Sequence, residues 1–222
     1  MTEAPVAAGD AYARYVAALR EGDRREAFRV IDEARLGGLD LGDLYIEVFQ
    51  PAMREVGRLW QENEVTVADE HLATAITQAA MARAFEQAYS GEASGRPSLI
   101  AACADLERHE VGLRMICDLL DVRGWETTYL GATVPIDSLV TMTARKRPEV
   151  VALSVAIAPH LPRLRLMIEQ IRALVPDPPL ILVGGRPFLA DPALAGRLGA
   201  DLTAPDARSA VELLEQRFPS PR

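Results

Sequence analysis

A short charged segment in the second half of the chain carries residue types that bind metal ions. It consists of Glu107, Arg108, His109, Glu110, Val111 and Gly112. A neutral imidazole is a good metal ligand, and a carboxylate two residues away can accept the other ring N–H, which fixes the tautomer and strengthens the donor. His109 and Glu107 suit these two roles. The alternative interpretation of His109 is a solvated loop histidine among charged neighbours.

Two further motifs follow this segment along the chain. After Gly112 come 41 residues and then Ser154-Val155-Ala156, and another 27 residues lead to Gly184 and Gly185. Glycines leave room where a bulky ligand passes close to the backbone, so the three glycines could line a slot, with the Ser154 hydroxyl as a polar partner. A plain strand-to-helix turn is the alternative interpretation of Gly184 and Gly185.

The second half of the chain alternates short apolar runs with segments of helical periodicity. Strands are predicted at residues 99–104, 127–130, 150–154 and 180–183, and helices at residues 111–123, 136–147 and 161–174. This alternation predicts an α/β domain over residues 98–222, with a parallel sheet covered by helices on both faces. Ligands bind beyond the carboxyl ends of the strands in such sheets, and all three motifs lie at that edge.

Residues 11–90 show helical periodicity almost throughout. Ala27, Val30 and Ile31 lie at i, i+3 and i+4, which places them on one helical face. Four such helices with short connections predict a four-helix bundle. Pro51 falls inside the third helix and should kink it or mark its restart. The small, polar residues 91–97 end in proline and predict a linker between the two domains.

The composition excludes several classes of protein. With 49% hydrophobic and 25% charged residues, the 222-residue chain is globular. A net charge of −8 gives no electrostatic reason to hold a phosphate backbone, so direct nucleic-acid binding is not expected. The longest apolar run, residues 150–158, is too short for a bilayer, and no export signal is recognised, which predicts a cytoplasmic protein. Cys103 and Cys117 are expected to be reduced and buried.

The motifs of the second half resemble those of the cobalamin (vitamin B12)-binding domain family. The family pattern is Asp-x-His-x-x-Gly, a gap of about 41, Ser-x-Leu, a gap of 26 to 28, and Gly-Gly. Both gaps agree over residues 97–222, and Leu130 to Pro135 resembles the family segment after the second strand. Glu107 replaces the usual aspartate but keeps the carboxylate, and Ala156 replaces leucine, which should only loosen packing near Ser154.

The resemblance implies a Rossmann-like (flavodoxin-like) domain that holds the cofactor with its own base displaced. His109 would then be the lower axial ligand of the cobalt. The cofactor-binding residues that it implies in this domain are Glu107, Arg108, Glu110, Val111, Gly112, Gly131, Ser154, Val155, Gly184 and Gly185.

A second resemblance involves Trp60, which is followed after nine residues by Glu70 and His71. This spacing is similar to the helical-bundle motif of adenosylcobalamin-dependent photoreceptors of the CarH type, in which the tryptophan and the acidic residue stand above the adenosyl group. The alternative interpretation is a core tryptophan and a solvated first helical turn. The family's histidine after the tryptophan is Gln61 here, so only His71 or His160 could act as upper ligand after photolysis. For His160, a solvated position or simple packing near the cofactor is the preferred interpretation.

Together the resemblances imply a photoreceptor of α plus α/β architecture that acts in light signalling and is not an enzyme. Adenosylcobalamin would lie between the bundle and the second domain, and light-driven cobalt–carbon cleavage would trigger a conformational or oligomeric change. Photoreceptors of the CarH type also carry an amino-terminal helix-turn-helix domain that binds DNA, whereas the bundle here begins near residue 11 and no such unit is expected. The light signal is therefore expected to pass through homo-oligomerisation, a protein partner or a second tetrapyrrole such as biliverdin. The alternative is a corrinoid protein that carries a methyl group, as methylcobalamin, in a methyltransferase system. A nucleotide-binding module would not explain both gaps.

Overall fold

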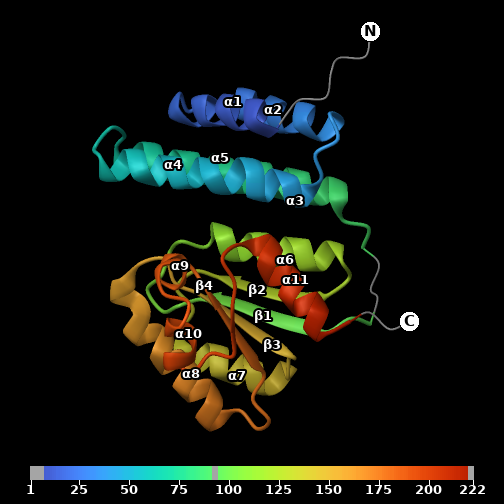
Figure 1. The fold of residues 1–222 in the computed structure, drawn as a ribbon, viewed down its shortest axis with the longest axis vertical. Coiled ribbons are helices and arrows are strands. Elements are labelled where there is room, and N and C mark those ends of the chain that lie inside the picture. Colours follow the sequence, from blue (N-terminus) through green and yellow to red (C-terminus); the bar gives the residue numbers. More distant parts are fainter. Residues whose placement is uncertain (1–7, 92–94, 220–222) are drawn as a thin grey trace. The chain divides into compact units, whose positions relative to one another are not determined.

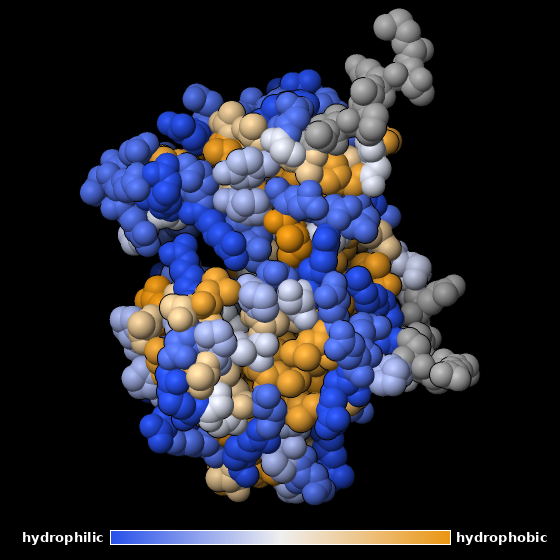
Figure 2. Space-filling model, in the orientation of Figure 1, coloured by the Kyte–Doolittle hydropathy of each residue, from blue (hydrophilic) through white to orange (hydrophobic). Residues whose placement is uncertain are grey.

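The computed structural model describes residues 8–91 and 95–219, which divide into two compact units at Tyr89 and Ser90 (Figure 1). Part of the expected linker, residues 92–94, lies outside the described residues. Most of the surface in view is hydrophilic (Figure 2), and among the described residues no helix is long and apolar enough to cross a membrane.

The first unit is helical, as predicted. Its elements are α1 (Ala8–Arg20), α2 (Arg24–Leu36), α3 (Leu41–Asp43), the π-helical segment η1 (Leu44–Phe49), α4 (Gln50–Gln61) and α5 (Val67–Ala88). Asp23 caps α2, and Thr66 and Asp69 form a capping box at the start of α5. The third predicted helix is one continuous run, α3 through α4, with a wide turn just before Pro51. Proline lacks the N–H for a regular helical bond, which accounts for this irregularity.

Aromatic rings fill the core of the helical unit. The Tyr15 and Phe49 rings meet edge to face with 5.2 Å between centroids, and Tyr45 packs against Phe49. The Tyr15 hydroxyl donates to Thr77 Oγ1 at 3.1 Å, which satisfies the one polar atom that this ring brings into the core. The predicted apolar face of α2 is buried, as the periodicity required.

The second unit is a five-stranded parallel sheet in the order β2-β1-β3-β4-β5. The strands are β1 (Ser98–Cys103), β2 (Glu126–Gly131), β3 (Val150–Ser154), β4 (Leu180–Gly184) and β5 (Leu202–Thr203). The helices are α6 (Val111–Val122), α7 (Ile136–Lys146), α8 (Leu161–Leu174), α9 (Arg186–Ala190), α10 (Leu194–Arg197) and α11 (Ala207–Arg217), with the short 3-10 helix η2 (Ala158–His160). Figure 1 shows α6 and α11 on one face of the sheet and α7 and α8 on the other.

This architecture confirms the predicted Rossmann-like domain. The four predicted strands and three predicted helices all occur, and the central strands are buried on both faces. Strand β5 and helices α9, α10 and α11 were not predicted. The two residues of β5 are too few to show a period. Both cysteines are free thiols in the interior, as expected, and burial raises the pKa of Cys103 to about 12.

Candidate functional site

The strand register places the predicted motifs side by side at the carboxyl edge of the sheet. Cys103, the last residue of β1, pairs with Ser154 of β3, and Ser154 pairs with Gly184 of β4. The backbone ladder continues past the strands, because Ala104 N donates to Ser154 O at 2.8 Å and Val155 N donates to Gly184 O at 3.0 Å. The loop after β1, which carries His109, therefore begins at the point where the other two motifs meet.

The Glu107 carboxylate is fully buried beneath this edge and organises the loop around it. Its Oε1 atom accepts hydrogen bonds from the backbone nitrogens of Arg108 (2.9 Å) and His109 (3.0 Å) and from His109 Nδ1 (2.5 Å). The predicted pairing of carboxylate and imidazole is thus present. Since Nδ1 faces Glu107, Nε2 is the ring atom that can act as a metal ligand, and the His109 side chain is 59% exposed.

The second oxygen of Glu107 binds the loop that follows β3. Oε2 accepts from Ala156 N at 2.8 Å, from Ile157 N at 3.4 Å and from His160 Nδ1 at 3.1 Å. Burial alone would raise the pKa of Glu107, but the hydrogen bonds from His109, Ala156 and His160 outweigh it and hold this pKa far below its ordinary value. Glu107 is therefore an ionised carboxylate that joins two loops.

The environment of His160 distinguishes between the two positions expected for it. The His160 side chain is only 20% exposed and is bonded to Glu107, so it is packed within the site and is not solvated. The contact between His160 and Glu107 is hard to predict from the sequence, because the two residues are separated by 53 positions in the chain. Because His160 and His109 share one carboxylate, His160 belongs to the same layer of the site as the proposed lower ligand. This argues against its use as an upper ligand.

The glycines of the motifs differ in what surrounds them. A Cβ atom added to Gly112 or to Gly184 would meet no atom within 4 Å, so both positions open onto free space. Gly185 has φ +119°, and its added Cβ would lie 1.8 Å from the Val155 carbonyl oxygen. The chain itself therefore requires glycine at position 185, in accord with the turn interpretation, whereas only Gly112 and Gly184 leave room for a ligand.

The remaining predicted residues of this domain lie around the same loops. Glu110 Oε2 accepts from Ala132 N at 2.9 Å, and an added Cβ on Gly131 would come within 2.8 Å of that oxygen, so Glu110 fixes the turn after β2. Thr133 N in this turn donates to Glu107 O at 3.3 Å. Arg108 is exposed and Val111 opens α6.

Exposed apolar side chains flank Glu107 on both loops. Leu106 is 56% exposed with φ +72°, a conformation that is rare for leucine, and Ile157 is 39% exposed. Sequence reasoning did not identify either residue, although a leucine inside a charged loop was an available signal. Large apolar groups beside an exposed imidazole suit a flat ligand with an apolar rim around a metal.

In the helical unit, the predicted residues lie at the end of α4 and the start of α5. Trp60 is 44% exposed, which excludes the interpretation as a core tryptophan. The Glu70 side chain accepts a hydrogen bond from Thr74 Oγ1 at 3.0 Å and lies 3.6 Å from His71 Nε2. The His71 side chain is 69% exposed.

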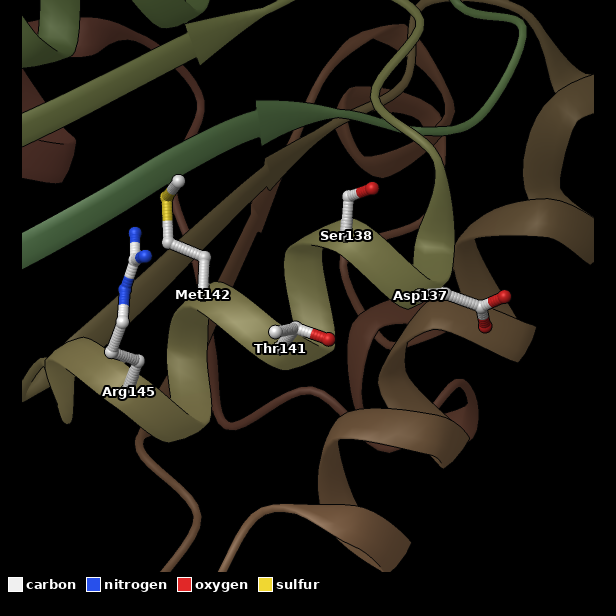
Figure 3. Close-up of a pocket in the computed structure, with 5 residues that line it drawn as sticks. All are labelled: Asp137, Ser138, Thr141, Met142 and Arg145. Carbon is white, nitrogen blue, oxygen red and sulfur yellow. The ribbon is translucent and has the colours of Figure 1, made fainter.

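A shallow groove on the second unit lies apart from the predicted motifs. It has a volume of about 340 Å³ and runs along α7 (Figure 3). Its lining consists of Asp137, Ser138, Thr141, Met142 and Arg145. The three sequence motifs contribute no side chain to this lining, so the groove is not the candidate site.

Comparison with known proteins shows the family to which this chain belongs. Two family models, each described as a B12 binding domain, match residues 11–84 and 97–215. The chain belongs to the B12-binding domain family. The expected cobalamin-binding domain is thereby confirmed.

Relatives of this B12-binding protein have two different roles. The transcriptional repressor CarA, an HTH-type protein of Myxococcus xanthus, is 34% identical over 167 residues, which cover 74% of this chain and 54% of the repressor. The chain thus spans about half of that relative. The trimethylamine corrinoid protein of Methanosarcina barkeri is 28% identical over 198 residues, which cover 87% of this chain and 90% of the relative.

A solved structure resembles the B12-binding chain over nearly its whole length. The monomethylamine corrinoid protein of Methanosarcina barkeri superposes with a TM-score of 0.83 and covers 96% of this chain and 100% of that one, at 17% identity. This likeness shows that the two proteins share a fold.

Proposed function

We propose that the chain binds adenosylcobalamin through His109, with the cofactor's own base displaced, and acts as a light sensor. The observation that carries the binding mode is the hydrogen bond from His109 Nδ1 to the buried, ionised Glu107, which leaves Nε2 as the cobalt ligand. Histidines that bind metals are commonly oriented in this way by a carboxylate.

The free space at the glycines supports a bulky cofactor at this edge. Gly112 and Gly184 would accommodate its displaced nucleotide tail, because neither position has an atom within 4 Å of an added Cβ. Ser154 lies beside Gly184 in the sheet and would offer its hydroxyl to that tail. Leu106 and Ile157 would contact the apolar rim of the corrin ring.

The sensor function rests on the helical unit. When bound, adenosylcobalamin would supply a cobalt–carbon bond that light can break. Trp60 is exposed and could cover the adenosyl group, while the Glu70 carboxylate could accept hydrogen bonds from it. Loss of these contacts on illumination would change which arrangement of the chain is favoured. The proposed sensor binds cobalamin alone, because neither the family models nor the relatives indicate a second tetrapyrrole.

A methyl carrier in a methyltransferase system is the second candidate. It is favoured by the extent of the match, because the chain spans 90% of the trimethylamine corrinoid protein but only 54% of CarA. The spacing of Trp60, Glu70 and His71 favours the sensor. In a methyl carrier, by contrast, the helical unit would admit partner enzymes, and the exposed cofactor face would accept and release a methyl group.

Illumination of the loaded protein separates these two functions. The purified chain is loaded with adenosylcobalamin in darkness, and its absorption spectrum and elution volume are recorded before and after green light. The sensor predicts a lasting spectral change together with a change in oligomeric state or hydrodynamic size. An unchanged elution volume, together with methyl transfer from the methylcobalamin form to a corrinoid methyltransferase, would support the carrier and contradict the sensor.

Replacement of Trp60 by alanine tests the cap directly. In the sensor, Trp60→Ala should weaken binding of adenosylcobalamin roughly tenfold, because an aromatic contact worth about 1.4 kcal/mol is lost, while hydroxocobalamin is affected much less. Leu36→Ala is the matched control, since Leu36 is 89% exposed in the same unit. Equal losses for both cobalamins would contradict a role above the adenosyl group.

A further inference from the structure

The groove along α7 carries an acidic and a basic side chain at its opposite ends (Figure 3). Asp137 lies in the first turn of this helix, and Arg145 lies in the last. Between the two charges the lining consists of Ser138, Thr141 and Met142. Met142 is half-buried, and the other four residues are exposed. The centre of the groove is therefore uncharged, while its two ends have opposite charges.

Neither charge of this groove has an ion-pair partner in the part of the chain that the structure describes. Asp137 and Arg145 are eight positions apart, which is about 12 Å along a helix, so they cannot pair with each other. An exposed ion pair forms only where an opposite charge comes within about 4 Å. The groove thus presents two unpaired charges of opposite sign at a spacing that the helix fixes.

The position of Thr141 makes this groove complementary to itself. Thr141 lies midway between the charges, four positions from each. A two-fold axis through Thr141, perpendicular to α7, would place α7 of a second copy antiparallel to the first. Asp137 of each copy would then lie opposite Arg145 of the other copy, which gives two equivalent ion pairs. The positive end of each helix dipole would also lie beside the negative end of the other.

We propose that the groove along α7 binds the same groove of a second copy, so that the protein forms a two-fold symmetric dimer through its second unit. A partner with one sign of charge would match only one end of the groove. Ser138 and Thr141 are small enough for two helices to approach closely, and Met142 supplies an adaptable apolar contact. One helix of 11 residues offers a small surface, so the dissociation constant is expected to be on the order of 10 µM.

This contact involves no residue of the proposed cobalamin site. The dimer is therefore expected in the apoprotein, and in the loaded protein both in darkness and after illumination. A change of oligomeric state caused by light would be additional to it. Failure of the dimer and failure of the proposed sensor are thus separate results.

Exchange of the two charges tests the dimer by sedimentation velocity of the apoprotein over a range of concentrations. Asp137→Arg and Arg145→Asp each replace two attractive contacts by two repulsive ones, so each variant should dimerise about tenfold more weakly or worse. The double variant with both changes restores the attraction and should dimerise like the wild type. Lys146→Asp is the matched control, because it makes the same change of charge at an exposed position of α7 outside the groove lining. It should leave the dimer unchanged.

A mixture of the two single variants tests the two-fold arrangement itself. The Arg145 that remains in Asp137→Arg would face the Asp137 that remains in Arg145→Asp, and the two introduced charges would face each other. Mixed dimers should therefore form although each variant alone stays monomeric. A cooperative urea transition shows that each variant is folded. Asp137→Asn or Arg145→Gln, with an expected loss of about threefold, replaces a variant that does not fold.

Three results would overturn the proposal. The first is a wild type that remains monomeric up to about 500 µM. The second is a dimer that both single variants form as tightly as the wild type, because such a dimer would use another surface. The third is a mixture of the folded single variants that forms no mixed dimer.

Discussion

Replacement of His109 by alanine is expected to weaken cobalamin binding by roughly 100-fold and to return the bound cofactor to its base-on spectrum. The ring supplies the proposed cobalt ligand, and its Nδ1 atom is fixed by Glu107 at 2.5 Å. Removal of the ring leaves the cobalt with its own base as the available lower ligand. Absorption titration of the apoprotein with hydroxocobalamin gives both the affinity and the ligation state.

Two controls define this result. Leu36→Ala changes an exposed residue of the helical unit that lies outside the predicted site and should leave the spectrum unchanged. The His109→Ala apoprotein should unfold at a lower urea concentration than the wild type, since the buried Glu107 carboxylate loses the hydrogen bond from Nδ1, and a cooperative unfolding transition shows that the variant is folded. A base-displaced spectrum that persists in His109→Ala would show that another side chain ligates the cobalt.

The arrangement of the three motifs could be predicted because it depends on simple geometry. Parallel strands place their carboxyl ends at one edge, so the ends of β3 and β4 had to lie at that edge once both apolar runs were identified as strands. The strand order was not predicted; in the structure β3 and β4 are neighbours, and Ser154 pairs with Gly184. The contact between Glu107 and His109 was equally accessible, because two positions along a loop can bring a carboxylate to an imidazole.

The parts that sequence reasoning missed depend on loop conformations. His160 reaches Glu107 only because the chain folds back after β3 and the backbone nitrogens of Ala156 and Ile157 bind the same carboxylate. Leu106 adopts φ +72°, which no propensity predicts for leucine. Hydrophobic periodicity carries no information about such turns, since they are fixed by tertiary hydrogen bonds to a single buried group.

The two adjacent glycines at the end of β4, Gly184 and Gly185, lead to different expectations on substitution. Gly185→Ala should destabilise the apoprotein by about 3 kcal/mol or more, because the added Cβ would lie 1.8 Å from the Val155 carbonyl oxygen at a φ of +119°. Gly184→Ala should leave stability within about 0.5 kcal/mol of the wild type, since its Cβ would meet no atom within 4 Å. Urea denaturation followed by circular dichroism measures both changes.

Cobalamin affinity should respond to Gly184→Ala, although the stability of the apoprotein does not. If the free space at Gly184 holds the nucleotide tail, the methyl group of Gly184→Ala would occupy part of it and reduce cobalamin affinity by roughly tenfold or more, because overfilling a close-packed site typically costs 1 to 3 kcal/mol. Gly112→Ala, which also opens onto free space, is the matched second variant. A folded Gly184→Ala protein with wild-type affinity would show that the tail does not pass beside β4, while the clash at Gly185 would stand independently of any ligand.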